Sequence, residues 1–251
     1  MANVIAIANH KGGVGKTTSV AFIGEALARN GKRVLLVDLD AQANLTAFFL
    51  NEDDVEEDVS EVLTGKLQGL PIKQLKPNLH LLPSSLALAR AETELNARIA
   101  REQILKGVLT PVQGSYDFIL LDCPPSLGIL TTNALVAAST LYIPLTAEAL
   151  PLKGLSMLED VAKMIQQTIN PELRIGGVII TRYNNRKLNK AVLNAIRAKY
   201  GETLFSTLIR ENIAVAETPA AGGDLYEYAP GSNGAQDYEA LTQEILKQWS
   251  M

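Results

Sequence analysis

The chain has 251 residues, of which 47% are hydrophobic and 20% are charged, and its net charge at pH 7 is −4. These fractions are ordinary for a folded globular protein and exclude a disordered chain. No apolar run reaches the length of a membrane span, and the first residues lack the features of a signal peptide, so we expect a cytoplasmic protein. The single cysteine, Cys123, excludes an internal disulfide and a multi-cysteine metal site.

Charge is distributed unevenly along the chain. Residues 51–61 (NEDDVEEDVSE) contain seven acidic residues and no basic one. The rest of the chain is therefore slightly basic, and the overall charge does not exclude an anionic partner. We interpret the acidic run itself as a solvated loop or helix start.

Seven apolar, strand-like runs recur along the chain, at residues 3–9, 33–38, 79–83, 118–122, 141–145, 175–181 and 204–209. Helical patterns fill the gaps, at about 17–30, 85–109, 131–138, 154–169, 188–200 and 235–249. Apolar strands that alternate with helices predict a doubly wound, mainly parallel α/β sheet with helices on both faces. We expect one domain, residues 1–251, with its ligand at the carboxyl ends of the strands.

A glycine-rich loop follows the first predicted strand and precedes a helix, with the sequence His10-Lys11-Gly12-Gly13-Val14-Gly15-Lys16-Thr17-Thr18. In this context the backbone N–H groups converge on an anion, and the helix N-terminus adds roughly half a positive charge. We predict that residues 11–18 bind ATP, that Lys16 reaches the β- and γ-phosphates, and that the Thr17 hydroxyl ligates Mg²⁺. A glycine turn with an incidental lysine is the structural alternative, and it is disfavoured by the strand and helix around the motif.

The loop departs from an ordinary Walker A motif, because His10 replaces the first glycine and Lys11 follows it. Further segments at 37–44 (VDLDAQAN), 118–126 (FILLDCPPS), 148–158 and 217–245 complete a pattern that covers nearly the whole chain. The sequence resembles the ParA/MinD family of deviant Walker A P-loop ATPases, and more specifically its ParA-type (Soj-like) members. It departs from the family at Ala41, where proline is usual.

The resemblance implies roles for single residues. Lys11 would reach across a sandwich dimer to the nucleotide of the partner. Asp40 would orient the attacking water, and Asp40, Asp122 and Thr17 would surround Mg²⁺. Two alternatives stay open: Asp40 is a loop or cap acid, or its neighbour Asp38 takes the metal-side role. The loop lysines, one Mg²⁺ and two aspartates suffice for ATP hydrolysis, which needs positioning and charge neutralisation.

In such proteins the base usually rests on loops after late strands, so the loops at 181–185 and 210–212 are candidates for adenine contacts, with Asn185 and Arg210 as the nucleotide-binding candidates. Glu148 is a candidate for a ribose contact in the dimer, and a solvent-facing acid is the alternative.

A basic stretch without acidic residues covers residues 182–199. Its helical part predicts a core face of Leu188, Ala191, Val192, Ala195, Ile196 and Tyr200. The candidate DNA-binding residues are Arg182, Arg186, Lys187, Lys190 and Arg197. A stripe of lysine and arginine without aromatic residues suits duplex phosphates, read without sequence preference, and a solvated helix face is the alternative.

The leading interpretation is a ParA-type partition or positioning ATPase associated with the nucleoid. ATP would drive homodimerisation and nonspecific DNA binding, and a ParB-like or other cargo adaptor would stimulate hydrolysis. Because the chain starts at its first strand, we expect no N-terminal helix-turn-helix extension. A MinD-like membrane switch would need a basic amphipathic C-terminal helix, which residues 238–251 do not resemble. An iron–sulfur reductase would need paired cysteines. A structural filament is the fourth alternative.

Overall fold

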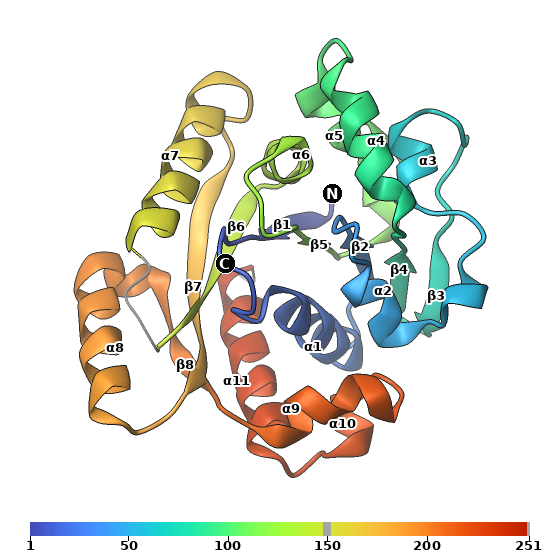
Figure 1. Cartoon of the computed structure of the whole chain (residues 1–251). Coiled ribbons are helices and arrows are strands. Elements are labelled where there is room, and N and C mark those ends of the chain that lie inside the picture. The colour runs from blue at the N-terminus through green and yellow to red at the C-terminus, as the bar shows by residue number, and fades with distance from the viewer. Residues whose placement is uncertain (148–151, 250–251) are drawn as a thin grey trace.

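The computed structural model describes residues 1–147 and 152–249. Its centre is one sheet of eight strands in the order β3-β4-β2-β5-β1-β6-β7-β8 (Figure 1). Neighbouring strands are parallel, except that β3 runs antiparallel to β4. Glu148, the ribose candidate, lies outside the described residues, as does part of the 148–158 segment.

The strands within the described ranges are β1 (Asn3–Ile7), β2 (Val34–Asp38), β3 (Lys73–Lys76), β4 (Leu79–Leu82), β5 (Phe118–Asp122), β6 (Thr140–Thr146), β7 (Arg174–Tyr183) and β8 (Leu204–Arg210). The longer helices are α1 (Lys16–Arg29), α4 (Ala87–Asn96), α6 (Ile129–Ala137), α7 (Leu152–Thr168), α8 (Lys187–Tyr200) and α11 (Asn233–Gln248). The shorter helices are α2 (Asn44–Phe49), α3 (Val59–Leu63), α5 (Ile104–Leu109), α9 (Ile213–Glu217) and α10 (Leu225–Tyr228).

Two hydrophobic layers cover the sheet, because side chains of a strand alternate between its faces. In β1, Val4 and Ala6 enter a core with residues of α3 to α8, whereas Ile5 and Ile7 enter a core with residues of α1, α2, α10 and α11. Strands buried on both faces read as continuous apolar runs, as the sequence does. The predicted doubly wound, mainly parallel fold is therefore confirmed.

Strand register brings the polar ends of the central strands together. In the parallel pairs, Ile7 of β1 lies beside Asp122 of β5, and Asp122 lies beside Asp38 of β2. The glycine-rich loop, the Asp38–Asp40 segment and Asp122 therefore meet at the carboxyl edge of the sheet, as expected for an open α/β fold.

Three details of the predicted elements were wrong. The edge strand β3 was missed, because its sequence KQLK has no apolar run. The helix predicted at 85–109 is two helices, α4 and α5, separated by a break in which Ala100 has φ 52°. The short helices α2, α3, α9 and α10 were not predicted, since they carry too few turns to show a period.

The acidic run behaves as interpreted. Its residues 52–54 and 56–57 are exposed, and Asp58 caps α3 by accepting a hydrogen bond of 2.7 Å from the backbone N–H of Ser60. In the ranges that the structure describes, no helix combines the length and apolar character required to cross a membrane.

Candidate functional site

The glycine-rich loop joins β1 to α1 and has the shape of an anion cradle. Gly13 and Gly15 have φ values of 70° and 85°, which other residues rarely adopt. Strand β7 supports the loop, since the Thr181 hydroxyl donates to the Val14 carbonyl at 2.8 Å. A side chain at Gly12 or Gly13 would meet nothing within 4 Å, so the upper face of the loop is open. Converging N–H groups at the start of the 14-residue α1 suit phosphate oxygens.

Lys16, the first residue of α1, is only 7% exposed. Its ammonium lies 3.5 Å from the Lys11 carbonyl and makes no shorter hydrogen bond among the described residues. Burial lowers the pKa of Lys16, and the nearby acidic groups Asp122, Cys123 and Asp40 oppose that shift. A desolvated ammonium at the mouth of an anion cradle is a strong ligand for phosphate.

Asp122 ends β5 and is 1% exposed. Burial raises its pKa well above the ordinary value, and Asp38 adds to this, whereas the Thr17 hydroxyl and Lys16 oppose it. Thr17 and Lys16 lie near Asp122 but do not reach hydrogen-bonding geometry. Both Asp122 carboxylate oxygens are therefore buried without a donor among the described residues. Such a carboxylate beside a threonine hydroxyl fits a Mg²⁺ site that is completed by waters and phosphate oxygens.

Asp38 is fully buried at the end of β2, but its oxygens are occupied. Oδ1 accepts from the Asp40 N–H at 3.1 Å, and Oδ2 accepts from the N–H and hydroxyl of Thr46 at 2.9 and 2.8 Å. Asp40 itself is half-buried, and its Oδ1 accepts from the Gln42 N–H at 3.0 Å. These contacts favour a structural role for Asp38. The Asp40 carboxylate lies close enough to Lys16 to oppose the lowering of the Lys16 pKa, and the catalytic role of Asp40 stays a prediction.

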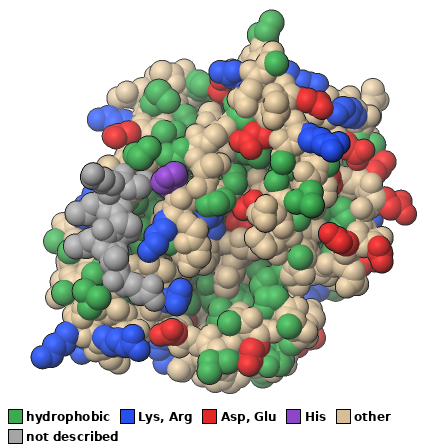
Figure 2. Space-filling view, in the orientation of Figure 1, with side chains coloured by type: hydrophobic (Ala, Val, Ile, Leu, Met, Phe, Trp, Pro, Cys, Tyr) green, Lys and Arg blue, Asp and Glu red, His purple; other side chains and the backbone are tan. Residues whose placement is uncertain are grey.

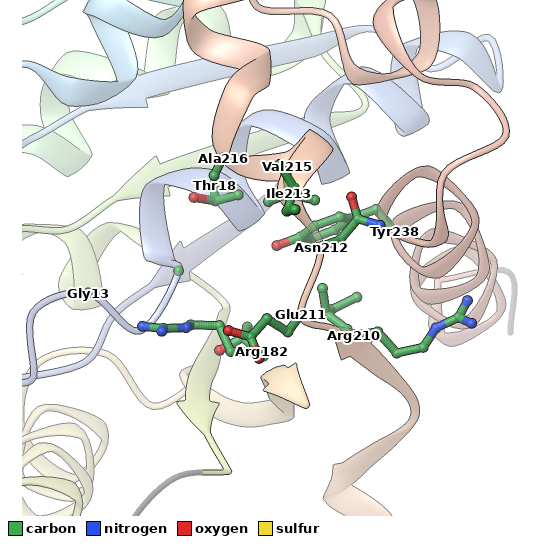
Figure 3. A pocket seen from close by; sticks show the side chains of 13 residues that line it. Gly13, Thr18, Arg182, Arg210, Glu211, Asn212, Ile213, Val215, Ala216 and Tyr238 are labelled. Atoms are coloured by element: carbon green, nitrogen blue, oxygen red, sulfur yellow. The ribbon is translucent and has the colours of Figure 1, made fainter. Parts of the chain in front are cut away.

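A cavity of about 680 Å³ opens beside the loop, between the ends of β7 and β8 and helix α9. Its lining combines the loop residues Gly13, Gly15 and Thr18, the strand ends Thr181, Arg182 and 209–212, and the apolar surface of Ile213, Val215, Ala216 and Tyr238 (Figure 3). The Asn212 amide oxygen, between β8 and α9, is buried near Gly234 of α11 without a donor among the described residues. A mostly apolar cavity next to an anion-binding loop suits the flat ring system of a base.

The two adenine candidates occupy different places. The Arg210 guanidinium extends away from the cavity toward α11 in Figure 3 and pairs with Asp237, with 2.7 Å between Nη2 and Oδ1. Asn185 is exposed in the loop before α8 and does not line this cavity. Both nucleotide assignments remain untested predictions. Sequence reasoning did not find Ile213, Val215 or Tyr238, because only the tertiary fold brings α9 and α11 to the glycine-rich loop.

The basic stretch lies on α8 and the end of β7. Arg182, Arg186, Lys187, Lys190 and Arg197 are all exposed, and Figure 2 shows basic side chains at the lower left, where α8 lies in Figure 1. The predicted core face of α8 was partly wrong. Val192 and Ile196 are buried, but Leu188 is 59% exposed and Ala191 and Ala195 are also exposed. The inward row instead includes Asn189 and Leu193, so small apolar residues lie among the basic side chains.

Comparisons with known proteins agree with this geometry. The family model described as AAA domain matches residues 2–175. The sporulation initiation inhibitor protein Soj of Bacillus subtilis is 39% identical over 249 residues, with 98% of both chains covered. The chromosome partitioning protein ParA of Caulobacter vibrioides is 36% identical, with 97% of this chain and 93% of ParA covered.

A solved structure extends the similarity to three dimensions. Cobyrinic acid a,c-diamide synthase from Mycobacterium smegmatis, solved with ADP or an ATP analogue and with magnesium, has a TM-score of 0.86 and 35% sequence identity. The match covers 100% of this chain and 96% of the synthase chain. With this fold, a glycine-rich loop that carries both Lys11 and Lys16, and full-length similarity to Soj and ParA, the chain belongs to the ParA/MinD family of deviant Walker A P-loop ATPases and resembles its ParA-type members.

Proposed function

We propose that this chain is a ParA-type ATPase that binds ATP with Mg²⁺, dimerises, binds DNA without sequence preference and is released by hydrolysis. The observation that carries the proposal is that Lys16 and Asp122 are both buried beside the glycine-rich loop and that the Asp122 carboxylate oxygens have no donor among the described residues. The basic surface of α8 and the similarity to Soj and ParA support the DNA-positioning role.

The residues divide the chemistry between them. Lys16 and the loop N–H groups hold the phosphates, while Thr17 and Asp122 would hold Mg²⁺. Mg²⁺, when bound, neutralises charge on the β- and γ-phosphate oxygens. Asp40 orients water for attack on the γ-phosphorus; as the new P–O bond forms, the bond from the γ-phosphorus to the bridging oxygen breaks, and ADP and phosphate are the products. The apolar residues of the cavity receive the adenine.

The dimer rests on Lys11. Its side chain is exposed on the open side of the loop, and the ammonium has no hydrogen-bond or ion-pair partner among residues 1–147 and 152–249. It is therefore available to a nucleotide on a second copy. We expect Lys11→Ala to bind ATP with similar affinity, because Lys16 and the N–H groups remain, but to lose ATP-dependent dimerisation and hydrolysis. Light scattering with ATP and with ADP tests this, and a variant that dimerises normally would make Lys11 an ordinary loop lysine.

The MinD-like alternative is not favoured by α11. This helix buries Tyr238, Leu241 and Ile245 in the core, so its apolar face is not available to a lipid surface. Pull-down on duplex DNA and on anionic vesicles, each with ATP and with ADP, separates the two functions. Retention on DNA with ATP alone supports the proposal, whereas ATP-dependent retention on vesicles alone supports the alternative.

We expect the double variant Arg186→Glu with Lys190→Glu to lose DNA binding while it still binds ATP and dimerises. Each reversal replaces attraction to a phosphate by repulsion, so affinity should fall on every sequence and depend less steeply on salt. Titration of two unrelated duplexes at several salt concentrations measures this. Arg90→Glu with Lys106→Glu is the matched control, since it makes the same charge change on exposed residues of α4 and α5. If both double variants lose the same DNA affinity, the α8 residues contribute only through the overall charge of the protein and do not form a DNA-binding surface.

A further inference from the structure

Two buried hydroxyl groups lie behind the Asp38–Asp40 segment. Thr46 in α2 is 5% exposed, and Ser84 in the loop after β4 is 1% exposed. The register of the parallel pair β2 and β4 places Val37 beside Leu82, so the residues after both strands emerge side by side. The loop after β4 is fixed from its other side, because the Pro83 carbonyl accepts from the Val59 N–H of α3 at 2.9 Å.

Thr46 and Ser84 connect the side chain of Asp38 to the backbone of Asp40 through a series of hydrogen bonds. The Thr46 hydroxyl donates to Asp38 Oδ2 at 2.8 Å and accepts from the Ser84 N–H at 2.9 Å. The Ser84 hydroxyl donates to the Asp40 carbonyl at 2.9 Å. The Asp40 N–H closes the ring by donating to Asp38 Oδ1 at 3.1 Å. The backbone of Asp40 is therefore held at both its N–H and its carbonyl.

The segment needs this support. Ala43 has φ 50°, a left-handed conformation that costs energy for a residue with a Cβ, and its N–H donates to the Asp40 carbonyl at 2.9 Å. A turn of this kind persists only when its surroundings determine it. Within residues 1–147 and 152–249, the Asp40 side chain has one hydrogen bond, from the Gln42 N–H, so its position depends on the backbone that carries it.

We propose that Thr46 and Ser84 are positioning residues for hydrolysis: their hydroxyls, with Asp38 as the acceptor, fix the backbone that aims the Asp40 carboxylate at the attacking water. This inference rests on the proposed ATPase function. It gives Asp38 a stated role as an anchor whose oxygens are filled by Thr46 and Asp40, rather than as a metal ligand. A shift of Asp40 by a fraction of an ångström slows the chemical step while phosphate binding is preserved, because the hydroxyls of Thr46 and Ser84 donate to Asp38 and Asp40, outside the phosphate loop.

The test compares Thr46→Val, which removes the hydroxyl at nearly constant shape, with Thr46→Ser, which keeps it. Thr64→Val is the matched control, because the Thr64 hydroxyl is equally buried and donates to the Ser60 carbonyl at 2.8 Å in α3. We expect kcat to fall about tenfold in Thr46→Val and in Ser84→Ala, with KM for ATP changed less than about twofold. Thr46→Ser and Thr64→Val should keep a kcat near the wild-type value.

A second measurement does not depend on hydrolysis. Amide hydrogen exchange at Asp40 and Ser84 should become about tenfold faster in Thr46→Val, and stay unchanged in Thr46→Ser and Thr64→Val. The inference is overturned if Thr46→Val matches Thr64→Val in both kcat and exchange, or if KM rises as much as kcat falls. If the wild-type protein shows no Mg²⁺-dependent ATPase activity, the proposed function fails, and exchange alone then decides whether the hydroxyls hold the segment.

Discussion

Lys16→Ala should bind ATP at least about a hundredfold more weakly than the wild-type protein. The Lys16 ammonium is buried beside the loop and has no strong partner among the described residues, so its hydrogen-bonding capacity is available to phosphate. Each charge-assisted hydrogen bond is worth roughly 1.5–3 kcal/mol, and two of them account for a loss of this size. The effect should exceed that of any other single substitution in the loop.

Titration with a fluorescent ATP analogue measures this loss. Lys16→Gln accompanies the alanine variant, because it keeps most of the side chain and a polar end group while it removes the positive charge. Lys11→Ala is the internal comparison, since that lysine is exposed and should not be needed for binding by one copy. Thermal unfolding of each variant shows whether the fold is intact. ATP affinity near the wild-type value in folded Lys16→Gln would refute the phosphate-loop assignment.

Much of the fold and the centre of the site could be predicted from sequence, because the relevant signals are local. Strands buried on both faces have to be apolar throughout, and the loop between β1 and α1 has to contain glycine where φ is positive, as at Gly13 and Gly15. Asp40 and Asp122 follow strands directly, so a parallel sheet alone brings them to one edge.

The residues that sequence reasoning missed are placed by long-range contacts. Ser84 reaches the Asp40 carbonyl across 44 positions of the chain, and Tyr238 reaches the cavity only because α11 packs beside α1. The edge strand β3 has no apolar run and is held by its pairing with β4. Its Lys76 also forms an ion pair of 2.8 Å with the buried Glu25 of α1. None of these contacts leaves a periodic signal in sequence.

The orientation of α8 shows a different limit. Its sequence offers two overlapping apolar rows, one through Leu188 and Ala191 and another through Val192, Leu193 and Ile196. Helical periodicity cannot choose between rows that differ by a small rotation. Packing chose the row with the larger side chains, which bury more apolar surface, and left Leu188 exposed.

We expect Asp40→Ala to bind ATP with an affinity near that of the wild-type protein and to hydrolyse it at least about a hundredfold more slowly. The substitution removes the carboxylate that orients water, while Lys16, Thr17 and Asp122 remain to hold the nucleotide and Mg²⁺. Stability should change little, because the carboxylate is half-buried and, in the part of the chain that the structure describes, accepts one hydrogen bond, from the Gln42 N–H. The variant should therefore accumulate as an ATP-bound dimer that stays on DNA.

Phosphate release and analogue binding, measured on the same preparation, separate the two steps. Asp40→Asn is the informative companion, since its amide oxygen can still accept from the Gln42 N–H while the negative charge is gone. Loss of hydrolysis in both variants, with ATP affinity preserved, assigns the effect to the charge of Asp40 rather than to the turn. Loss of ATP binding in both variants would instead indicate that Asp40 is a metal ligand or is needed for folding. Normal ATP turnover in Asp40→Asn would show that the charge of Asp40 is not needed for hydrolysis and that its role is to accept the hydrogen bond from the Gln42 N–H.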